Sequence, residues 1–447
     1  MSDSRPNVLW LMTDEQRTDA LGCYGSRWAV TPHLDLLASQ GALFRHAVTP
    51  APVCVPARVS LVTGLSPSHT GVWYNHNHGR EFPLLTEPFR EAGYATACIG
   101  KQGYHTARPA FALEVPLVLS EHVHYFRYAP RYDEAAHGMV RYPAGPEPWI
   151  LAGRFPASAE ETAEAEAIRA AQSWLGSLAS GSPFLLCLSL NGPHTPVVPP
   201  APYDSLIPAE DLGLPAAAKD LPPGRPEWVG TDVVEAASAD RLTPEQITAM
   251  RRAYYGEVAY LDALLGRLLV WMGAHGLLEN TIIAFTSDHG THLGDYGLVQ
   301  KQTFYEPVVT VPLVFWYPRA IPAGSSYDTP VATLSLLPTL LELAGLPPPR
   351  CDGASLAGPL TQRTEPQTIP VFSEFSLGSY RVRSEDRLAM VRDGHWKASC
   401  CLDPGPRDVD LCDLAADPHE RRNLHGDPSC AAIEARLLGL ITDHVAG

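Results

Sequence analysis

The chain has 447 residues, of which 45% are hydrophobic and 18% charged, and its formal net charge is −16. This length exceeds that of a typical single domain, so we expect one large core with a smaller appended unit. The acidic charge argues against nucleic acid and anionic membranes as partners, because both require a basic face, but it allows a small anionic substrate wherever positive charge is concentrated locally.

Four short apolar runs, each bounded by Pro, Gly or polar residues, predict buried parallel strands. Helical stretches separate these runs, and this alternation predicts an α/β sandwich with a large, mainly parallel sheet flanked by helices. In such a sheet, ligands bind beyond the carboxyl ends of the strands. The four runs cover residues 7–12, 184–190, 282–285 and 311–316.

The clearest helix is predicted over residues 243–275. Thr243 can cap its N-terminus, Pro244 suits the first helical position, and Gln246 completes a capping box. Apolar residues recur at three- and four-residue spacing between positions 250 and 268, as in a helix that packs against a core.

The pattern changes after a run of prolines at 347–349. Short apolar runs and an acidic, aliphatic stretch follow, which predict a small antiparallel unit at the C-terminus. We therefore expect a main domain over residues 1–365 and a C-terminal α+β subdomain over residues 366–447. The apolar runs cover residues 369–372, 388–392 and 395–398, and the acidic stretch covers residues 410–424.

Targeting and redox signals favour a cytoplasmic protein. The first apolar run is too short for the hydrophobic region of a signal peptide and ends directly at Asp14. No later run approaches the roughly 18 residues that a membrane span requires. The nine cysteines are odd in number and form no C-x-x-C pair, so neither a disulfide framework nor a zinc ribbon is indicated.

A cysteine, a proline and an arginine stand close together in the segment 53–64. Pro56 lacks an amide proton and has a fixed φ, so it suits the first turn of a helix. Cys54 would then lie at the helix N-terminus, where amide protons and the helix dipole stabilise negative charge. Arg58 lies one turn further on the same face and can bind an anionic group. A lone cysteine is usually a small buried hydrophobic residue, but this spacing favours a reactive one.

This C-x-P-x-R pattern, followed by L-x-T-G, resembles the signature of the formylglycine-dependent sulfatases, although Ala57 stands where the family more often has serine. In that family a dedicated enzyme oxidises the cysteine to formylglycine, whose hydrated aldehyde is the nucleophile. The resemblance implies a sulfuric ester hydrolase with an alkaline-phosphatase-like sandwich fold. It also implies a small anionic ester as substrate and a formylglycine-generating enzyme as a maturation partner for Cys54.

Further segments resemble the family in the same order along almost the whole chain. So many matching segments in the correct order are very unlikely to arise by chance. These segments are residues 14–25, 31–35, 99–105, 193–196, 254–262, 287–290, 294–307 and 410–424.

The resemblance implies one divalent metal ion. Asp288 and His289 follow the strand predicted before them, so they should meet Asp14 at the carboxyl edge of the sheet. Hard oxygen ligands suit Ca²⁺, which we expect, while the imidazole keeps Mn²⁺ as an alternative. Glu15 stands where the family often has aspartate, and His289 where it frequently has asparagine. The implied ligands are Asp14, Glu15, Cys54, Asp288 and His289.

The resemblance also assigns roles in catalysis. Arg58, Lys101 and Lys301 would stabilise the charge of the ester in the transition state. His194 is the candidate acid that protonates the leaving alcohol. His105 is the candidate base that helps to regenerate the aldehyde, and two extra residues separate it from Lys101 compared with the family's Gly-Lys-x-His segment. Asn75 is a weaker candidate for a substrate contact.

Two alternative functions and the oligomeric state stay open at this point. The first alternative is a phosphonate monoester or phosphodiester hydrolase of the same superfamily, which often has a histidine at the position of His289. The second is a non-catalytic binding protein in which Cys54 remains a thiol. A homo-oligomer is compatible with the sequence, which contains no signal that decides the matter.

Overall fold

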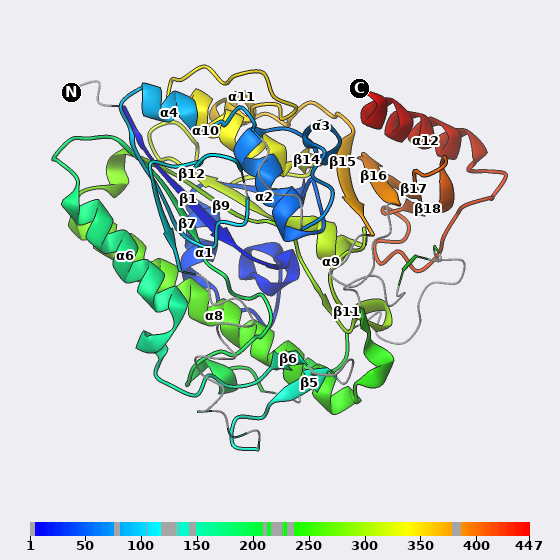
Figure 1. Cartoon of the computed structure of the whole chain (residues 1–447), viewed down its shortest axis with the longest axis horizontal. Helices are drawn as coiled ribbons and strands as arrows, with labels where there is room; N and C mark the ends of the chain where they lie inside the picture. The colour runs from blue at the N-terminus through cyan, green and yellow to red at the C-terminus, as the bar shows by residue number, and fades with distance from the viewer. Residues whose placement is uncertain are drawn as a thin grey trace.

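The computed structural model describes residues 5–75, 81–104, 106–117, 131, 133, 135–142, 149–208, 212–215, 226, 228–229, 237–377 and 386–447. A large sheet lies between two helix layers, and a smaller sheet lies beside it toward the C-terminus (Figure 1). The candidate base His105 lies outside the described residues.

Within the described residues, the large sheet has nine strands in the order β13-β2-β12-β9-β1-β7-β3-β4, with β14 paired to β2. The central pairs β9-β1, β1-β7, β7-β3 and β3-β4 are parallel, which confirms the predicted fold class. The strands are β1 (Asn7–Thr13), β2 (Ala42–Val48), β3 (Ala95–Gly100), β4 (Leu113–Pro116), β7 (Phe184–Ser189), β9 (Thr281–Ser287), β12 (Thr310–Trp316), β13 (Ser325–Tyr327) and β14 (Val331–Ala332).

The direction predicted for the run at 311–316 is wrong. This run forms β12, which is antiparallel to both β9 and β2. Between Ser287 and Thr310 the chain forms only short elements and no crossover helix. It therefore begins β12 at the edge where β9 ends and has to run back along it. A strand that is buried on both faces is an apolar run in either direction, so the sequence pattern did not reveal this reversal.

Helices cover both faces of the large sheet, because its strands are apolar on both faces. In β1, Leu9 and Leu11 pack toward α6 and α8, while Val8 and Trp10 belong to the core on the opposite face. The layer of α6 and α8 includes α1 (Pro32–Gln40), α6 (Ala163–Ser177) and α8 (Pro244–Ala274), and the opposite layer includes α2 (Cys54–Thr63), α4 (Glu87–Glu91) and α10 (Leu336–Leu343) (Figure 1).

The long helix predicted from its capping pattern is confirmed as α8. The side chain of Thr243 accepts a hydrogen bond from the Gln246 amide, and the Gln246 side chain accepts one from the Thr243 amide at 2.9 Å. This reciprocal pair satisfies amide groups that have no partner within the helix.

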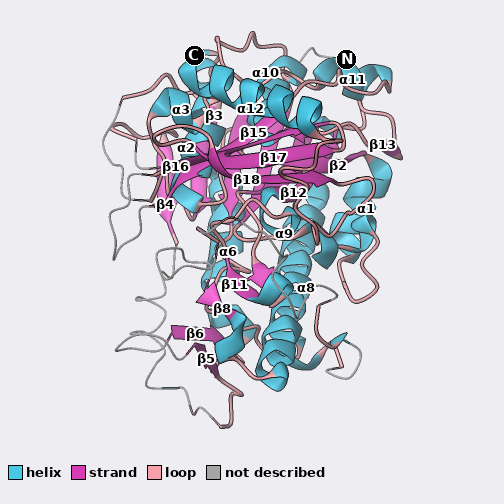
Figure 2. Cartoon of the chain, turned by 90° about the vertical axis from the view of Figure 1, so that its right-hand side faces the viewer, coloured by secondary structure: helices cyan, strands magenta, loops and turns pink. Residues whose placement is uncertain are grey.

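The C-terminal part contains a four-stranded antiparallel sheet among its described residues, as predicted. Helix α12 (Ala431–Ala446) supplies the helical part of the predicted α+β subdomain, although its position was not predicted, and it packs on this sheet through Leu437 and Ile441 (Figure 2). The domain boundary between residues 365 and 366 stays a prediction. The strands are β15 (Val371–Ser376), β16 (Arg387–Asp393), β17 (Trp396–Cys401) and β18 (Arg407–Asp413).

Short elements complete the described chain. They are α3 (Pro67–Thr70), β5 (Val140–Tyr142), β6 (Trp149–Ala152), β8 (Ala237–Ser238), β10 (His292–Leu293), β11 (Leu298–Gln300), α9 (Glu306–Val309) and α11 (Ala357–Gln362), together with single 3-10 turns.

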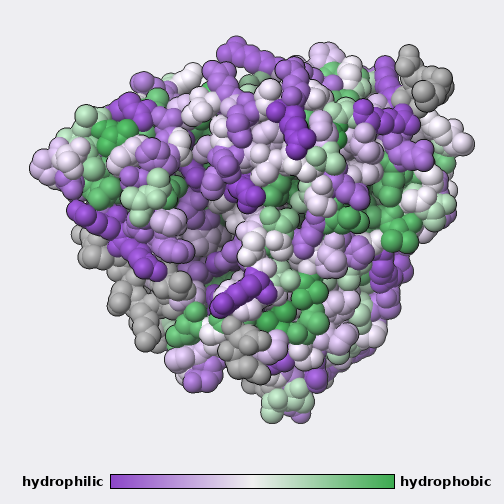
Figure 3. Space-filling model, turned by 180° about the vertical axis from the view of Figure 1, so that it is seen from behind, coloured by the Kyte–Doolittle hydropathy of each residue, from purple (hydrophilic) through white to green (hydrophobic). Residues whose placement is uncertain are grey.

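The polar surface and the unpaired cysteines agree with what the composition predicts. In the view of Figure 3, hydrophilic side chains cover much of the molecule, and hydrophobic ones form separate small areas. All nine cysteines are free thiols. None of the helices in the described ranges is both long enough and apolar enough to cross a membrane.

Candidate active site

Several ionisable side chains follow the ends of neighbouring strands. Asp14 follows β1, Asp288 follows β9 and Lys101 follows β3, and these strands belong to the consecutive run β9-β1-β7-β3 of the sheet. Their carboxyl ends therefore bring the three side chains to one edge, as predicted for Asp14 and Asp288. Both carboxylates are completely buried.

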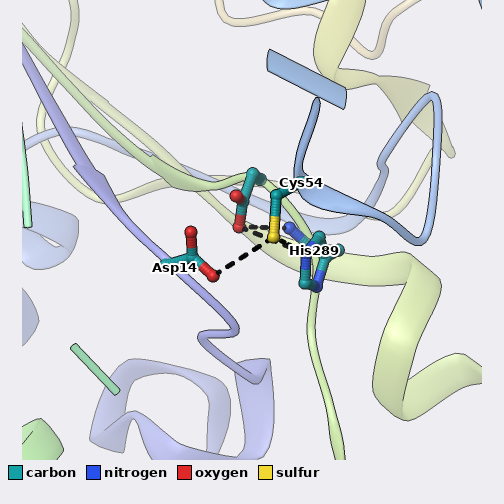
Figure 4. Close-up of side chains that lie close together, drawn as sticks. Asp14, Cys54 and His289 are labelled. Carbon is teal, nitrogen blue, oxygen red and sulfur yellow. Dashed lines mark hydrogen bonds and ion pairs between the residues drawn. The ribbon is translucent and has the colours of Figure 1, made fainter. Parts of the chain in front are cut away.

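Cys54 lies at the first position of α2, as predicted. Its sulfur is 3.2 Å from Nε2 of His289, and it is 3.7 Å from Oδ1 of Asp14. Figure 4 shows both side chains directed at the sulfur. Lysine amino groups approach it as well, with Nζ of Lys301 at 3.4 Å and Nζ of Lys101 at 3.8 Å. The cysteine thus stands at a helix N-terminus and is surrounded by charged groups.

The surroundings of Cys54 favour its anionic form. Burial and Asp14 raise the pKa of the thiol. Lys101, Lys301 and His289 lower this pKa and outweigh both effects. The pKa of the thiol therefore lies well below its usual value. An anionic group bound at the same position would meet the same positive potential.

Arg58 connects the carboxylates on either side of the cysteine. Its Nε donates to Asp288 at 2.7 Å, and its Nη2 donates to Asp14 at 2.8 Å. Nη1 donates to the Ser189 hydroxyl and to the carbonyl of Lys101, both at 2.9 Å. Arg58 is fully buried, and these contacts direct its guanidinium at protein groups. The sequence analysis did not predict Ser189, because a serine at a strand end carries no specific signal.

Lys301 is held in place by an unusual backbone. Gln300 and Gln302 on either side have left-handed φ angles of 74° and 67°. Such conformations cost free energy in residues other than glycine and persist where the surrounding structure fixes them. Nζ of Lys301 lies 2.6 Å from Oε1 of Glu15 and 3.0 Å from Nε2 of His194.

Glu15 also has a left-handed backbone, with a φ of 62°. The hydroxyl of Tyr254 on α8 donates to the Glu15 carbonyl and accepts a hydrogen bond of 2.9 Å from the Arg17 amide. One tyrosine thus fixes the turn that follows Asp14. Tyr254 belongs to the predicted apolar stripe of the helix and to one of the segments that resemble the family, but its polar function was not predicted.

His194 borders the site from the loop after β7. Its Nε2 lies 3.4 Å from Oε1 of Glu15, and its Nδ1 lies 2.6 Å from the carbonyl of Thr195. Burial lowers the pKa of His194, as does Lys301, but Glu15 and Asp14 outweigh them and raise it above its usual value. The carboxylates of Glu15 and Asp14 therefore favour the protonated form of this imidazole.

Asn75 has a structural contact. Its Oδ1 accepts the amide hydrogen of Val55 at 3.0 Å and so satisfies a free donor in the first turn of α2. The suggested substrate contact of Asn75 stays a prediction.

The C-terminal sheet supports the Lys301 segment from outside. Lys397 of β17 donates to the carbonyl of Phe304 at 2.9 Å and to Glu306 at 3.0 Å. Glu420 accepts the Glu306 amide at 2.8 Å. These are long-range contacts between buried charged groups, and no local pattern in the sequence reveals them.

The donor atoms at the centre suit a divalent metal ion. Ligand atoms of Asp14, Cys54, Asp288 and His289 all lie within 4.8 Å of one another, and a second group joins Asp14 to Glu15 and His194. Glu15, one of the five predicted ligands, thus belongs to the second group. The mixture of carboxylates, an imidazole and a cysteine-derived group is chemically suited to such an ion.

Three carboxylates and three basic side chains form ion pairs with one another at the centre. The carboxylates are those of Asp14, Glu15 and Asp288, and the fixed cations are Arg58, Lys101 and Lys301.

Comparisons with known proteins agree with this geometry. A family model described as Sulfatase matches residues 6–346, and a model of the N-sulphoglucosamine sulphohydrolase C-terminal region matches residues 294–445. Choline-sulfatase of Rhizobium meliloti is 29% identical over 98% of this chain and 86% of its own length. Iduronate 2-sulfatase of Mus musculus is 30% identical over 77% of this chain and 70% of its own.

Solved structures show the same similarity over the whole chain. The phosphonate monoester hydrolase of Agrobacterium radiobacter has a TM-score of 0.81 and 26% sequence identity, and the match covers 98% of this chain and 96% of that one. The predicted family resemblance and the predicted fold class are both confirmed.

Proposed function

The chain belongs to the sulfatase family of sulfuric ester hydrolases, and we propose that it cleaves sulfate monoesters with a formylglycine formed from Cys54 and with a bound divalent metal ion. The observation that carries this proposal is the position of Cys54 at the N-terminus of α2, with Lys101, Lys301 and His289 within 3.8 Å of its sulfur.

Asp14, Asp288 and His289, together with the modified Cys54 side chain, would hold the metal ion, whereas Glu15 groups with Asp14 and His194. When bound, the ion would polarise the ester and lower the pKa of the nucleophile. We propose Ca²⁺ because most of the donors are hard oxygens, with Mn²⁺ as the alternative that the imidazole allows.

Formylglycine would supply an aldehyde hydrate with two oxygens, one for attack at sulfur and one for the later release of inorganic sulfate. Lys101 and Lys301 are placed to stabilise the negative charge of the ester, because their amino groups already surround the Cys54 sulfur. Arg58 would fix the two carboxylates that face the metal ion. The role of His105 stays a prediction.

The proton for the leaving alcohol would come from Nε2 of His194. This atom lies 3.0 Å from the amino group of Lys301, so it stands at the edge of the positive pocket around Cys54. Glu15 favours the protonated imidazole, which can then donate to the alcohol oxygen as the bond to sulfur breaks.

A phosphonate monoester hydrolase is the second candidate, because the solved structure of such an enzyme has a TM-score of 0.81 with this chain. The two functions differ in the charge and geometry of the ester. We expect kcat/KM for an aryl sulfate to exceed the values for a phosphonate monoester and a phosphodiester that carry the same phenol. A higher value for either phosphorus ester would replace the proposed function by the second one.

The role of His194 predicts a specific kinetic effect. His194→Ala should slow esters of high-pKa alcohols far more than esters of activated phenols, because an activated phenolate leaves without a proton. The measurement is the slope of log kcat/KM against leaving-group pKa, which should be clearly steeper in this variant than in the wild type.

Lys301→Ala is the matched control for that slope. A residue that stabilises the charge of the ester should slow all leaving groups by a similar factor, on the order of 10²-fold or more. Parallel lines for the wild type and His194→Ala would mean that His194 only positions the substrate.

A further inference from the structure

A further pair of acidic side chains, the buried Glu257 and the half-buried Glu164, lies next to the His194 loop. Glu164 at the start of α6 and Glu257 in the middle of α8 line a cavity of about 30 Å³, together with Asn191 and His194. A water molecule needs roughly 10–15 Å³ on this measure, so the cavity has room for a single ion or a couple of waters.

The carboxylate of Glu257 lacks a hydrogen-bond partner for one of its oxygens, and the ring nitrogens of the neighbouring His194 face Thr195, Lys301 and Glu15 instead. Glu257 is 6% exposed, and its Oε2 has no hydrogen-bond partner. Glu164 forms a hydrogen bond with the backbone of Gly192. None of the described residues that line the cavity is a lysine or an arginine. A buried carboxylate without a cation is strongly unfavourable, so the pair requires either a proton or a bound cation.

The pKa values of Glu164 and Glu257 also indicate that the pair binds either a proton or a cation. Burial raises the pKa of Glu257 well above its usual value, and Glu164 adds to this effect. Burial also raises the pKa of Glu164, against hydrogen bonds from the backbone. A cation that enters the cavity would therefore displace a proton, and its binding would strengthen as the pH rises.

We propose that Glu164 and Glu257, with the neighbouring Asn191, bind a small divalent metal ion at a site separate from the one beside Cys54. The donors are oxygen atoms without a thiol, which suits a hard cation such as Ca²⁺. The bound ion would connect α6 and α8 to the loop 191–196 and so hold the His194 loop against the two helices.

The test is a calcium titration of the full-length protein by calorimetry, with circular dichroism to show that each variant is folded. Glu257→Gln preserves the shape of the side chain and should remove one equivalent of bound Ca²⁺, and Glu164→Gln should do the same. Glu166→Gln is the matched control, because Glu166 lies in the same helix but is exposed, and it should bind as many ions as the wild type. A folded Glu257→Gln protein with the wild-type stoichiometry would overturn the proposal.

A second comparison separates this site from the one beside Cys54. Asp288→Asn should leave the binding that depends on Glu257 intact, and the double variant with Glu257→Gln should lose it. If the centre beside Cys54 binds no Ca²⁺, the wild type should still bind one ion and Glu257→Gln none. Calorimetry in two buffers of different ionisation enthalpy should also show proton release at neutral pH. If Asp288→Asn and the double variant Asp288→Asn/Glu257→Gln bind the same number of Ca²⁺ ions, the proposal is wrong.

Discussion

Cys54→Ala should reduce the hydrolysis of an activated aryl sulfate by on the order of 10⁴-fold or more, because it removes the nucleophile of the proposed mechanism. The fold should persist, since Lys101 and Lys301 keep carboxylate partners in Asp14 and Glu15. The measurement combines steady-state turnover with a thermal unfolding curve. Turnover close to that of the wild type would remove Cys54 from the reaction.

Cys54→Ser separates two properties of the nucleophile. A serine offers one oxygen, so it can attack sulfur and release the alcohol, but it has no second oxygen that could expel the sulfate. We expect a burst of at most one phenol per enzyme, followed by very slow turnover, and a sulfated serine in the mass spectrum. Sustained turnover by this variant would contradict the need for an aldehyde.

Asp14→Asn should lower kcat/KM by about 10²–10³-fold or more, because it removes a carboxylate from the heart of the charged centre. Asp14 lies 2.8 Å from Arg58 and 2.5 Å from Lys101, and it belongs to both candidate groups of metal ligands. The amide preserves the shape, whereas alanine would also remove the acceptor that Lys101 uses and leave Arg58 with Asp288 as its remaining carboxylate, at a cost of about 3–5 kcal/mol in stability.

Asp19→Asn is the matched control for Asp14, because Asp19 lies in the same loop but its side chain is 54% exposed and pairs with Arg17. It should retain most of the activity. Chelation of the wild-type enzyme should lower turnover at least as much as Asp14→Asn does, and Ca²⁺ or Mn²⁺ added back should identify the ion. Full activity of thoroughly chelated enzyme would contradict the metal assignment.

The sequence predicted those parts of the fold that depend on local patterns. Thr243 and Gln246 have a reciprocal capping pattern, and this pattern located the start of α8. Apolar runs located the central strands, because strands covered on both faces must be apolar throughout. The direction of β12 depends instead on the path of the chain between Ser287 and Thr310, which carries no periodic signal.

In the site, too, residues with a local sequence signal could be predicted, and residues that act through long-range contacts could not. Asp14, Cys54 and Asp288 could be found because they stand at the ends of strands or at a helix start, where neighbouring elements bring them together. Tyr254 and Lys397 act across long sequence separations, on the backbone of Glu15 and of Phe304 respectively. Their function depends on the packed structure, so composition and spacing gave no sign of it.

The central claim is that Cys54 becomes formylglycine and that activity depends on this change. The direct measurement is the mass of the peptide that contains residue 54, from protein made with and without a formylglycine-generating enzyme, alongside the specific activity of each preparation. We predict an aldehyde at position 54 only in the first preparation and an activity proportional to the modified fraction. Full turnover by protein in which Cys54 is entirely a thiol would contradict the account.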